Sequence, residues 1–243
     1  MNKSKLTTII FLSIFLYLPM ALNAHVPTVT YIIFRDAVYL QNANLPETMR
    51  LYAAAKQEIE QSFTGADMYL ALSRCEALMG VTFKAAGKDN EAASYFEQGI
   101  AWAERSLALQ PTSNGYLLLG SNISFLCEVR PSYGMRNIGK IEENAIKALE
   151  LDPNNLMAKH LIASRYILAP WPFANIRKGV AILEEITSQN YMILERDDLF
   201  SLYLLLEAAN LKQRKNQEAQ IWRDKAAAIY PGNNFISLLM NIR

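Results

Sequence analysis

Residues that could take part in catalysis are few in this sequence, and they stand far apart. The chain has two histidines, His25 and His160, and two cysteines, Cys75 and Cys127. An HExxH motif, a CxxC motif, a glycine-rich phosphate loop and a serine nucleophile elbow are all absent. Zinc hydrolysis, nucleotide binding and elbow-type acyl transfer therefore lack the residues that each chemistry needs at close spacing.

Adjacent carboxylates are the other possible source of chemistry. They occur at 142–143, 184–185 and 197–198. Successive side chains on a helix point in different directions, so we interpret these pairs as solvated faces or helix caps. A hydrolase would instead need two carboxylates that face each other across a cleft. We expect no enzyme activity, no cofactor and no metal site.

The N-terminal residues predict an export signal. Lys3 and Lys5 precede an apolar run at 6–18, and a segment with small residues ends at Ala24. The apolar run is shorter than the ~20 residues that a membrane-spanning helix needs. We predict a signal peptide at 1–24 and a periplasmic mature protein. An N-terminal membrane anchor that is not cleaved is the alternative.

The overall charge points away from a nucleic-acid partner. The net charge of the chain is +1, and loss of Lys3 and Lys5 with the signal peptide would leave −1. One short basic cluster stands at 212–215, which is too little positive charge for binding to a phosphate backbone. Because 51% of the residues are hydrophobic, the chain can bury a sizeable core in one domain or one repeat array.

Apolar residues recur at spacings of three and four along most of the chain, which predicts an all-α fold. We expect an irregular segment at 25–44, within which 26–34 could be extended. The run Pro170, Trp171 and Pro172 interrupts the pattern, because proline lacks a backbone donor. The expected helices span 45–63, 67–86, 90–110, 113–128, 138–151, 155–168, 176–188, 198–211, 216–230 and 234–242.

A recurring ending indicates that the helices form pairs. The sequences Ala-Leu-Gln-Pro at 108–111, Glu-Leu-Asp-Pro at 150–153 and Ala-Ile-Tyr-Pro at 228–231 close three segments. They are 42 and 78 residues apart, so the period is about 40 residues. Such a period is typical of helix-turn-helix units that bury their faces by stacking. In this register Cys75 and Cys127 stand ~18 Å apart along neighbouring helices, so we predict two buried free thiols.

These units resemble tetratricopeptide repeats. The family pattern of small, bulky and aromatic positions is matched in the first unit by Gly80, Phe83, Ala92, Phe96 and Gly99. The resemblance covers roughly 70–232 and implies a helical repeat domain at 45–243, either a right-handed solenoid or a compact body with an internal pocket. Longer helices, extra residues at 128–139 and the double-proline insertion depart from the pattern. Further matches are Gly120, Ile123, Ala145, Ala148, Pro153, Ala163, Tyr166, Ala219, Ala226 and Pro231.

The resemblance also implies which residues face a ligand. It places the first helix of each pair on the inner surface, where a ligand would lie. In three units the inner positions are Arg74, Ala77, Val81, Lys84 and Ala85, then Asn114, Leu117, Ser121, Ser124 and Phe125, then Met157, His160, Ser164, Ile167 and Leu168. We select Arg74, Ser121, Asn122, Phe125, His160, Ser164 and Trp171 as candidate ligand-binding residues.

Each candidate also has a structural interpretation. Arg74 could pair with a nearby carboxylate, and His160 could be a hydrogen-bonded structural residue. Asn122 could satisfy a backbone group, and Trp171 could be a packing wedge between its prolines. The sequence alone leaves both interpretations open.

Two functions remain. The first hypothesis is an exported scaffold that binds a protein or peptide partner in a groove. The second is a periplasmic component that binds a small solute in a pocket or associates with a TRAP-type transporter. An open groove would favour the scaffold, and a closed cavity would favour the solute. We expect no nucleic-acid partner, and membrane contact only through an uncleaved N-terminal segment.

Overall fold

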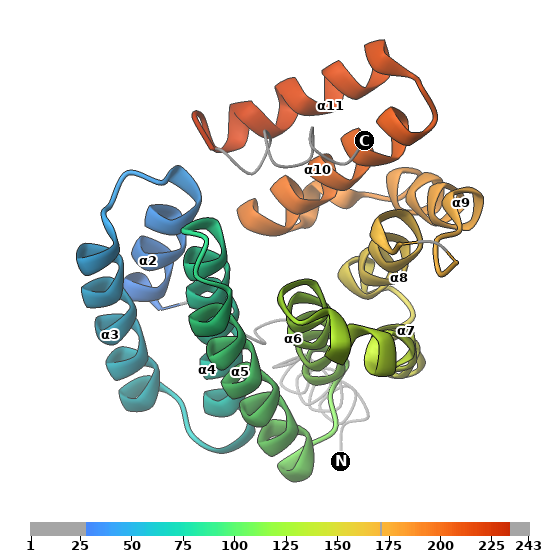
Figure 1. The fold of residues 1–243 in the computed structure, drawn as a ribbon. Coiled ribbons are helices and arrows are strands. Elements are labelled where there is room, and N and C mark those ends of the chain that lie inside the picture. Colours follow the sequence, from blue (N-terminus) through green and yellow to red (C-terminus); the bar gives the residue numbers. More distant parts are fainter. Residues whose placement is uncertain (1–27, 171, 234–243) are drawn as a thin grey trace, which may run out of the picture.

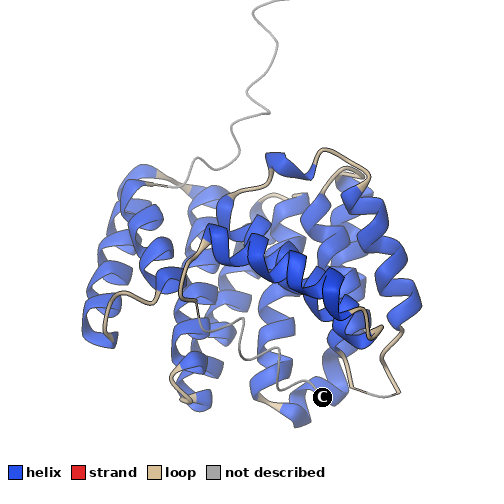
Figure 2. Cartoon of the chain, turned by 90° about the horizontal axis from the view of Figure 1, so that it is seen from above, coloured by secondary structure: helices blue, strands red, loops and turns tan. Residues whose placement is uncertain are grey.

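The computed structural model describes residues 28–170 and 172–233, and this part of the chain contains helices and loops but no strands (Figure 2). The prediction of an all-α fold is confirmed. The predicted signal peptide at 1–24 and the predicted helix at 234–242 lie outside the described residues. The helices are α2 (Val29–Leu40), α3 (Leu45–Ser62), α4 (Gly65–Ala85), α5 (Asp89–Leu109), α6 (Ser113–Val129), α7 (Pro131–Leu151), α8 (Leu156–Leu168), α9 (Ile176–Thr187), the short 3₁₀ helix η2 (Tyr191–Ile193), α10 (Arg196–Lys212) and α11 (Asn216–Ile229).

The helices pack as successive pairs, in an all-α helical repeat fold. Each odd-numbered helix packs on the even-numbered helix that precedes it, from α2 with α3 to α10 with α11. The even-numbered helices α2, α4, α6, α8 and α10 also contact one another in turn. Figure 1 shows the pairs arranged in a ring, in which α10 and α11 return to the side of α2. The even-numbered helices therefore form the inner layer.

Side-chain caps explain where several helices begin. Thr28, Asn44 and Asn155 each accept a hydrogen bond from a backbone N–H in the first turn of the following helix. These caps satisfy amide groups that have no partner within the helix. The first turn of α3 also contains Pro46, where the missing N–H costs little.

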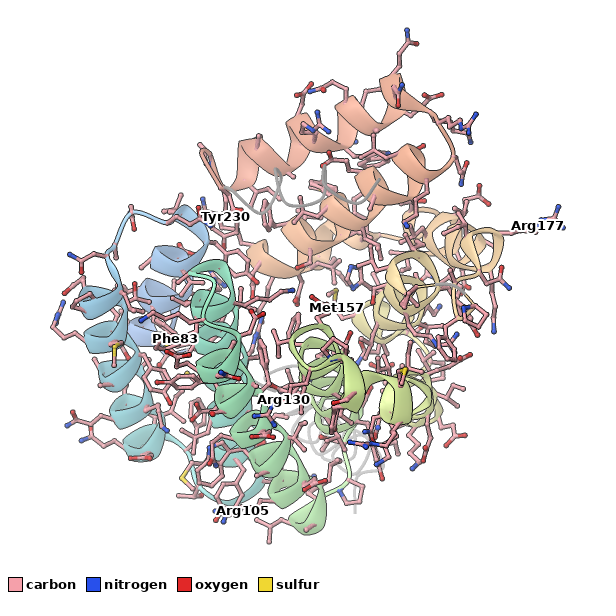
Figure 3. All side chains as sticks on the ribbon, viewed as in Figure 1. Phe83, Arg105, Arg130, Met157, Arg177 and Tyr230 are labelled. Carbon is pink, nitrogen blue, oxygen red and sulfur yellow. The ribbon has the colours of Figure 1, made fainter. Side chains whose placement is uncertain are left out.

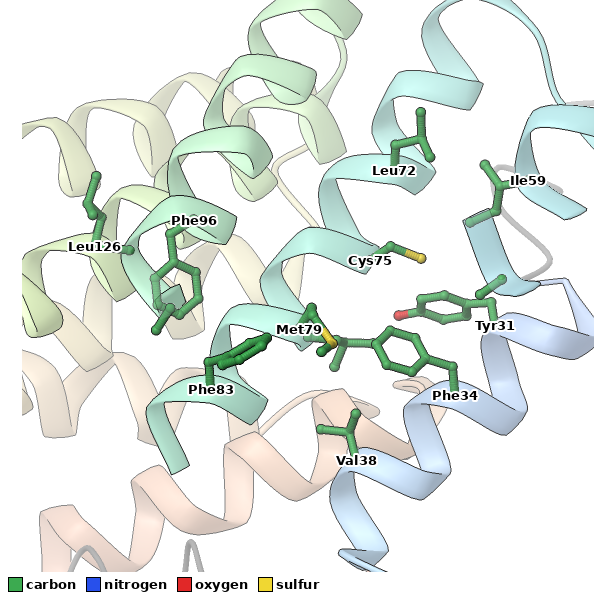
Figure 4. Close-up of a cluster of buried hydrophobic side chains, with 14 residues drawn as sticks. Tyr31, Phe34, Val38, Ile59, Leu72, Cys75, Met79, Phe83, Phe96 and Leu126 are labelled. Carbon is green, nitrogen blue, oxygen red and sulfur yellow. The ribbon is translucent and has the colours of Figure 1, made fainter. Parts of the chain in front are cut away.

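The first helix corrects the prediction of an irregular segment at 25–44. Residues Val29–Leu40 form α2, whose buried side chains Tyr31, Phe34 and Val38 recur at spacings of three and four. Its cluster of aromatic and β-branched residues favours a strand locally, but this spacing buries one helical face. Figure 4 shows these side chains directed toward Met79 of α4. The repeat domain therefore begins before residue 45, and α2 is the first inner helix.

The extra residues at 128–139 lengthen a helix. We expected the helix to begin at 138, but α7 begins at Pro131, seven residues earlier. Proline is tolerated in a first helical turn, so Pro131 both ends α6 and begins α7. Gly134 in the added turns lies against the backbone of Cys127, where an added Cβ would come within 3.0 Å of the Cys127 carbonyl oxygen. This close approach holds the longer helix against α6.

Small residues stand where neighbouring helices approach most closely, as the repeat pattern predicts. A Cβ on Gly80 of α4 would lie 2.3 Å from the ring of Phe96 of α5. A Cβ on Gly120 of α6 would lie 2.8 Å from Leu161 of α8. No real contact is so short, so the two glycines are required for this packing.

The two cysteines differ in their surroundings. Both are free; Cys75 is buried in the core between α2 and α4, and Cys127 is half-buried. The prediction that both are buried is therefore wrong for Cys127, because this residue lines the central cavity described below.

Among the described helices, none combines the length and the apolar composition needed to cross a membrane.

Candidate functional site

A central cavity of about 1370 Å³ lies inside the ring of inner helices. All the predicted inner positions of the first two units line it, from Arg74 to Ala85 and from Asn114 to Phe125. In the third unit Ile167 is the exception, because its side chain is buried against Gly179 of α9. Figure 3 shows Met157 of α8 pointing toward the middle of the ring, and Arg177 of α9 pointing away from it. The repeat register thus predicts most of the wall.

The ring is closed by polar contacts between its first and last helices, which we call the seam. Arg35 of α2 donates to Asp197 of α10 at 3.3 Å across a gap of 162 residues in sequence. Asp36 accepts hydrogen bonds from Arg196 at 3.0 Å and from the Tyr230 hydroxyl at 3.1 Å. The seam consists of Arg35, Asp36, Arg74, Glu195, Arg196, Asp197 and Tyr230.

Aromatic rings pack beside these charges. Tyr39 at the end of α2 stacks on Tyr230, with ring centroids 4.9 Å apart, and meets the edge of Phe200 at 5.6 Å. Asn233 donates a hydrogen bond to the carbonyl of Tyr39. Figure 3 shows Tyr230 next to the end of α2. The first and last helix pairs are thus held by a stacked apolar contact as well as by ion pairs.

Arg74 belongs to the seam, and its structural interpretation is the one that the geometry supports. Its Nη1 and Nη2 donate to the two carboxylate oxygens of Glu195 at 3.2 and 3.0 Å, and Nη2 also donates to Asp197 at 3.0 Å. The guanidinium lies over the ring of Tyr31 at 5.5 Å. Arg74 lines the cavity, but its charge is already balanced by carboxylates from α10 and its N-cap.

The sequence interpretation of 197–198 as a solvated face or cap is wrong. Asp197 is only 5% exposed and sits between two guanidinium groups, Arg35 and Arg74. Asp198 lines the cavity, and 31% of its side-chain surface is accessible. The repeat register could have predicted this position for Asp198, because α10 is the first helix of its pair and therefore an inner helix. Asp198, Ser201 and Leu205 line the cavity at spacings of three and four residues.

The ionisation of Asp198 is unusual. Burial raises the pKa of Asp198 to about 7, Arg74 acts in the opposite direction, and Asp197 adds to the increase. Burial can dominate although part of the side chain is accessible, because Asp198 lies on the wall of the central cavity rather than on the outer surface. A carboxyl group with such a pKa exchanges its proton near neutral pH.

His160 of α8 is a neutral residue of the wall. Its Nε2 lies 3.3 Å from the carbonyl oxygen of Ser201 on α10. Burial lowers the pKa of His160 to about 4, and this hydrogen bond offsets part of the decrease. The imidazole of His160 therefore carries no charge at neutral pH. It links α8 to α10 and presents an uncharged polar surface to the cavity.

The remaining predicted site residues fall in different places. Ser121, Phe125 and Ser164 line the cavity; Phe125 stacks on Phe96, and the hydroxyl of Ser164 donates to the carbonyl of Leu161. Trp171 lies outside the described residues.

Asn122 is not part of the wall, and its assignment as a ligand contact is wrong. It is fully buried between α4, α5 and α6, where its Nδ2 donates to Ser73 at 3.2 Å and to the carbonyl of Leu118 at 3.0 Å. A Cβ on Gly99 would lie 2.2 Å from its side-chain oxygen. Asn122 is one position out of phase with the inner face, so it points into the helix interface.

The rest of the cavity surface is mostly apolar. Leu117, Ile141 and Leu204 line it, and an ion pair between Lys84 and Glu128 lies at its edge. Large apolar side chains continue the wall into solvent-exposed positions, at Met135, Leu168, Phe173 and Ile193. Within the described residues, no group of histidine, cysteine and acidic side chains is arranged to hold a metal ion.

A scan against protein-family models found no match to this sequence, and a search of curated proteins found none either. Function is therefore inferred from the geometry of the cavity and the seam, and from the chemistry of the residues that line them. The resemblance to tetratricopeptide repeats stays a prediction.

Proposed function

We propose that this chain is a helical-repeat protein that encloses a small, mainly apolar solute in its central cavity. The cavity carries the proposal: its volume is about 1370 Å³, compared with about 300–1,000 Å³ for common small-molecule sites. It is large enough for an elongated molecule. Polar groups of the wall, such as Asp198, His160 and Ser121, stand on different inner helices, an arrangement that orients a ligand.

The closed seam favours a solute over a protein or peptide partner. A peptide that binds along the inner surface of an open solenoid needs access along the whole groove. Here Arg35 and Asp36 of α2 and Arg74 of α4 join the first helix pairs to the start of α10, so the inner surface does not end in an open groove on that side. The solute hypothesis thus replaces the scaffold hypothesis as the leading one.

The exposed apolar residues at the cavity edge fit the same function. Met135 is 76% exposed and Ile193 is 74% exposed, although both also line the cavity. An apolar solute that enters past such residues stays in contact with apolar surface. This contact lowers the free-energy cost of transferring the solute from a membrane or a carrier to the cavity. We retain export to the periplasm, and association with a TRAP-type transporter, as accompanying proposals.

Native mass spectrometry of the protein purified from its own cells tests this function. We expect a bound non-protein mass that is released on denaturation. Ser121→Trp places an indole on the cavity wall and should remove that mass, whereas Ser132→Trp, at an exposed position of α7, should retain it. The proposal fails if the wild-type protein carries no ligand and no apolar compound raises its thermal midpoint, or if Ser121→Trp retains the ligand fully.

A further inference from the structure

The charges around the cavity indicate which kind of solute fits, an inference that rests on the proposed function. We infer that the solute carries a cationic nitrogen at one end of an apolar body, and that this nitrogen pairs with Asp198. Three observations support this class of ligand: Arg35 and Arg74 already have close carboxylate partners, Asp198 has only one distant ion pair, and tyrosine side chains lie nearby.

The two arginines that act on Asp198, Arg35 and Arg74, are poorly placed to capture an anionic solute. Arg74 holds the two oxygens of Glu195 and one oxygen of Asp197 at 3.0–3.2 Å. Arg35 contacts Asp197 at 3.3 Å and Asp36 at 3.1 Å. A carboxylate or phosphate ligand would have to displace these partners, and would leave buried carboxylates without a counter-charge.

Asp198, in contrast, is available. Its only ion pair is a 3.9 Å contact with Arg74, and in the described part of the chain its carboxylate accepts no hydrogen bond. Arg35, Arg74 and Arg196 face four carboxylates, those of Asp36, Glu195, Asp197 and Asp198. This group of side chains has one negative charge in excess when Asp198 is ionised, and a cation in the cavity would balance it.

Tyrosines give a cation further favourable contacts. Tyr31 lines the cavity and is 4% exposed, yet its hydroxyl has no hydrogen-bond partner within the described residues. Tyr39 also lines the cavity, and burial raises the pKa of Tyr39, with the carboxylates of Asp197 and Asp198 adding to the increase. One face of Tyr31 already lies under Arg74, and one face of Tyr39 is stacked on Tyr230. The remaining ring surface and the Tyr31 hydroxyl oxygen are what these residues offer to a cation beside the carboxylate.

This binding mode has a definite pH dependence. The charged and titratable groups that act on Asp198 are Arg35 on α2, Arg74 on α4, and Glu195 and Asp197 next to it. Because burial raises the pKa of Asp198 to about 7, part of the empty protein is protonated there at neutral pH. A cation favours the carboxylate form, so binding releases a proton and becomes tighter as pH rises through this pKa.

Three probes with the same apolar chain separate the possibilities: decyltrimethylammonium, decanol and decanoate, each measured by titration calorimetry below its micelle concentration. We expect the cation to bind about tenfold or more tightly than decanol at about pH 8, and to lose much of that advantage at about pH 5.5. Calorimetry in buffers of different ionisation enthalpy should detect the released proton. This measurement on the wild-type protein does not depend on the folding of any variant.

Asp198→Asn should remove the preference for the cation while leaving decanol binding intact. Asp224→Asn, at an exposed position of α11, is the matched control and should bind all three probes like the wild type. Tighter binding of decanoate, or an unchanged cation preference in Asp198→Asn, would overturn the inference while decanol binding still supported an apolar cavity. If none of the probes binds and the purified protein carries no ligand, the proposed function fails as well.

Discussion

Two kinds of contact hold the ring together, and they differ in chemistry. Neighbouring helices pack through apolar surfaces in which a glycine receives a large side chain, as Gly80 receives the ring of Phe96. The seam joins helices that are far apart in sequence, and there long charged side chains meet, such as Arg35 and Asp197. One set of contacts depends on shape, and the other depends on paired charges.

The difference separates the stability of the repeats from the closure of the ring. Apolar burial is favourable at every interface between neighbours, so each pair is stabilised by the next. A buried ion pair loses much of its attraction to the cost of removing both charges from water, so the seam contributes less net stability than its number of contacts suggests. Its charges instead select one arrangement of the first and last pairs. The cavity depends on that arrangement.

The largest loss of stability is expected when an atom is added to a tightly packed interface between two adjacent helices. Gly80→Ala places a Cβ 2.3 Å from a ring atom of Phe96, which is itself fully buried and cannot move freely. We expect a decrease of about 2–3 kcal/mol in the free energy of unfolding, measured by urea denaturation.

Gly139→Ala is the matched control, because no atom lies within 4 Å of the added Cβ and the residue is inside α7. Alanine is the better helix former, so this variant should be about 0.5–1 kcal/mol more stable than the wild type. Equal effects of the two substitutions would mean that close packing at Gly80 does not limit stability.

A smaller effect is expected when the seam is weakened. Asp197→Asn removes the negative charge that Arg35 and Arg74 share, and we expect a loss of about 2 kcal/mol. Hydrogen exchange should rise mainly in α2, because the seam holds that helix to α10. Cavity-dependent ligand binding should weaken in parallel.

Glu207→Gln tests whether this response is particular to the seam. Glu207 is fully buried and pairs with Arg223 at 2.7 Å, but both residues belong to the last helix pair. In Glu207→Gln, the increase in hydrogen exchange should be confined to α10 and α11. If Glu207→Gln loosens α2 as strongly as Asp197→Asn does, closure of the ring is not a separate property of the seam.

Sequence periodicity predicts the neighbour interfaces well, for a physical reason. Each helix must bury an apolar stripe against the next, so Ala92, Phe96 and Gly99 mark the contact even without a structure. The same reasoning failed for α2, where aromatic and β-branched residues suggested extended backbone. Tertiary burial of Tyr31 and Phe34 outweighs that local preference.

The seam could not be predicted in the same way. Arg35 and Asp197 have no periodic signal, and charged residues in a sequence are more often solvated than buried. Only the closure of the ring brings them together. The inner wall was predictable from the register of the repeats, but its chemistry was not, because the charge of Arg74 is balanced by residues more than a hundred positions away.

The smallest effects concern protons on the cavity wall, where His160 and Asp198 should oppose each other. Burial lowers the pKa of His160 to about 4, below its value of about 6.5 in the unfolded chain, so its contribution to stability is lost as pH falls through that window. Burial raises the pKa of Asp198 to about 7, above about 4 when unfolded, so its contribution is lost as pH rises through that window.

Between about pH 4.5 and about pH 6.5 the two slopes should largely cancel in the wild-type protein. His160→Gln should leave the Asp198 slope, with stability falling by about 1 kcal/mol as pH rises, and Asp198→Asn should leave the opposite slope. Urea unfolding at several pH values measures both. If the unfolding free energy changes with pH in the same direction in both variants, His160 and Asp198 do not titrate as their burial predicts. Opposite slopes would place the pH-sensitive part of the molecule at the cavity and the seam. The apolar interfaces between neighbouring helices would then contribute little to the pH dependence of stability.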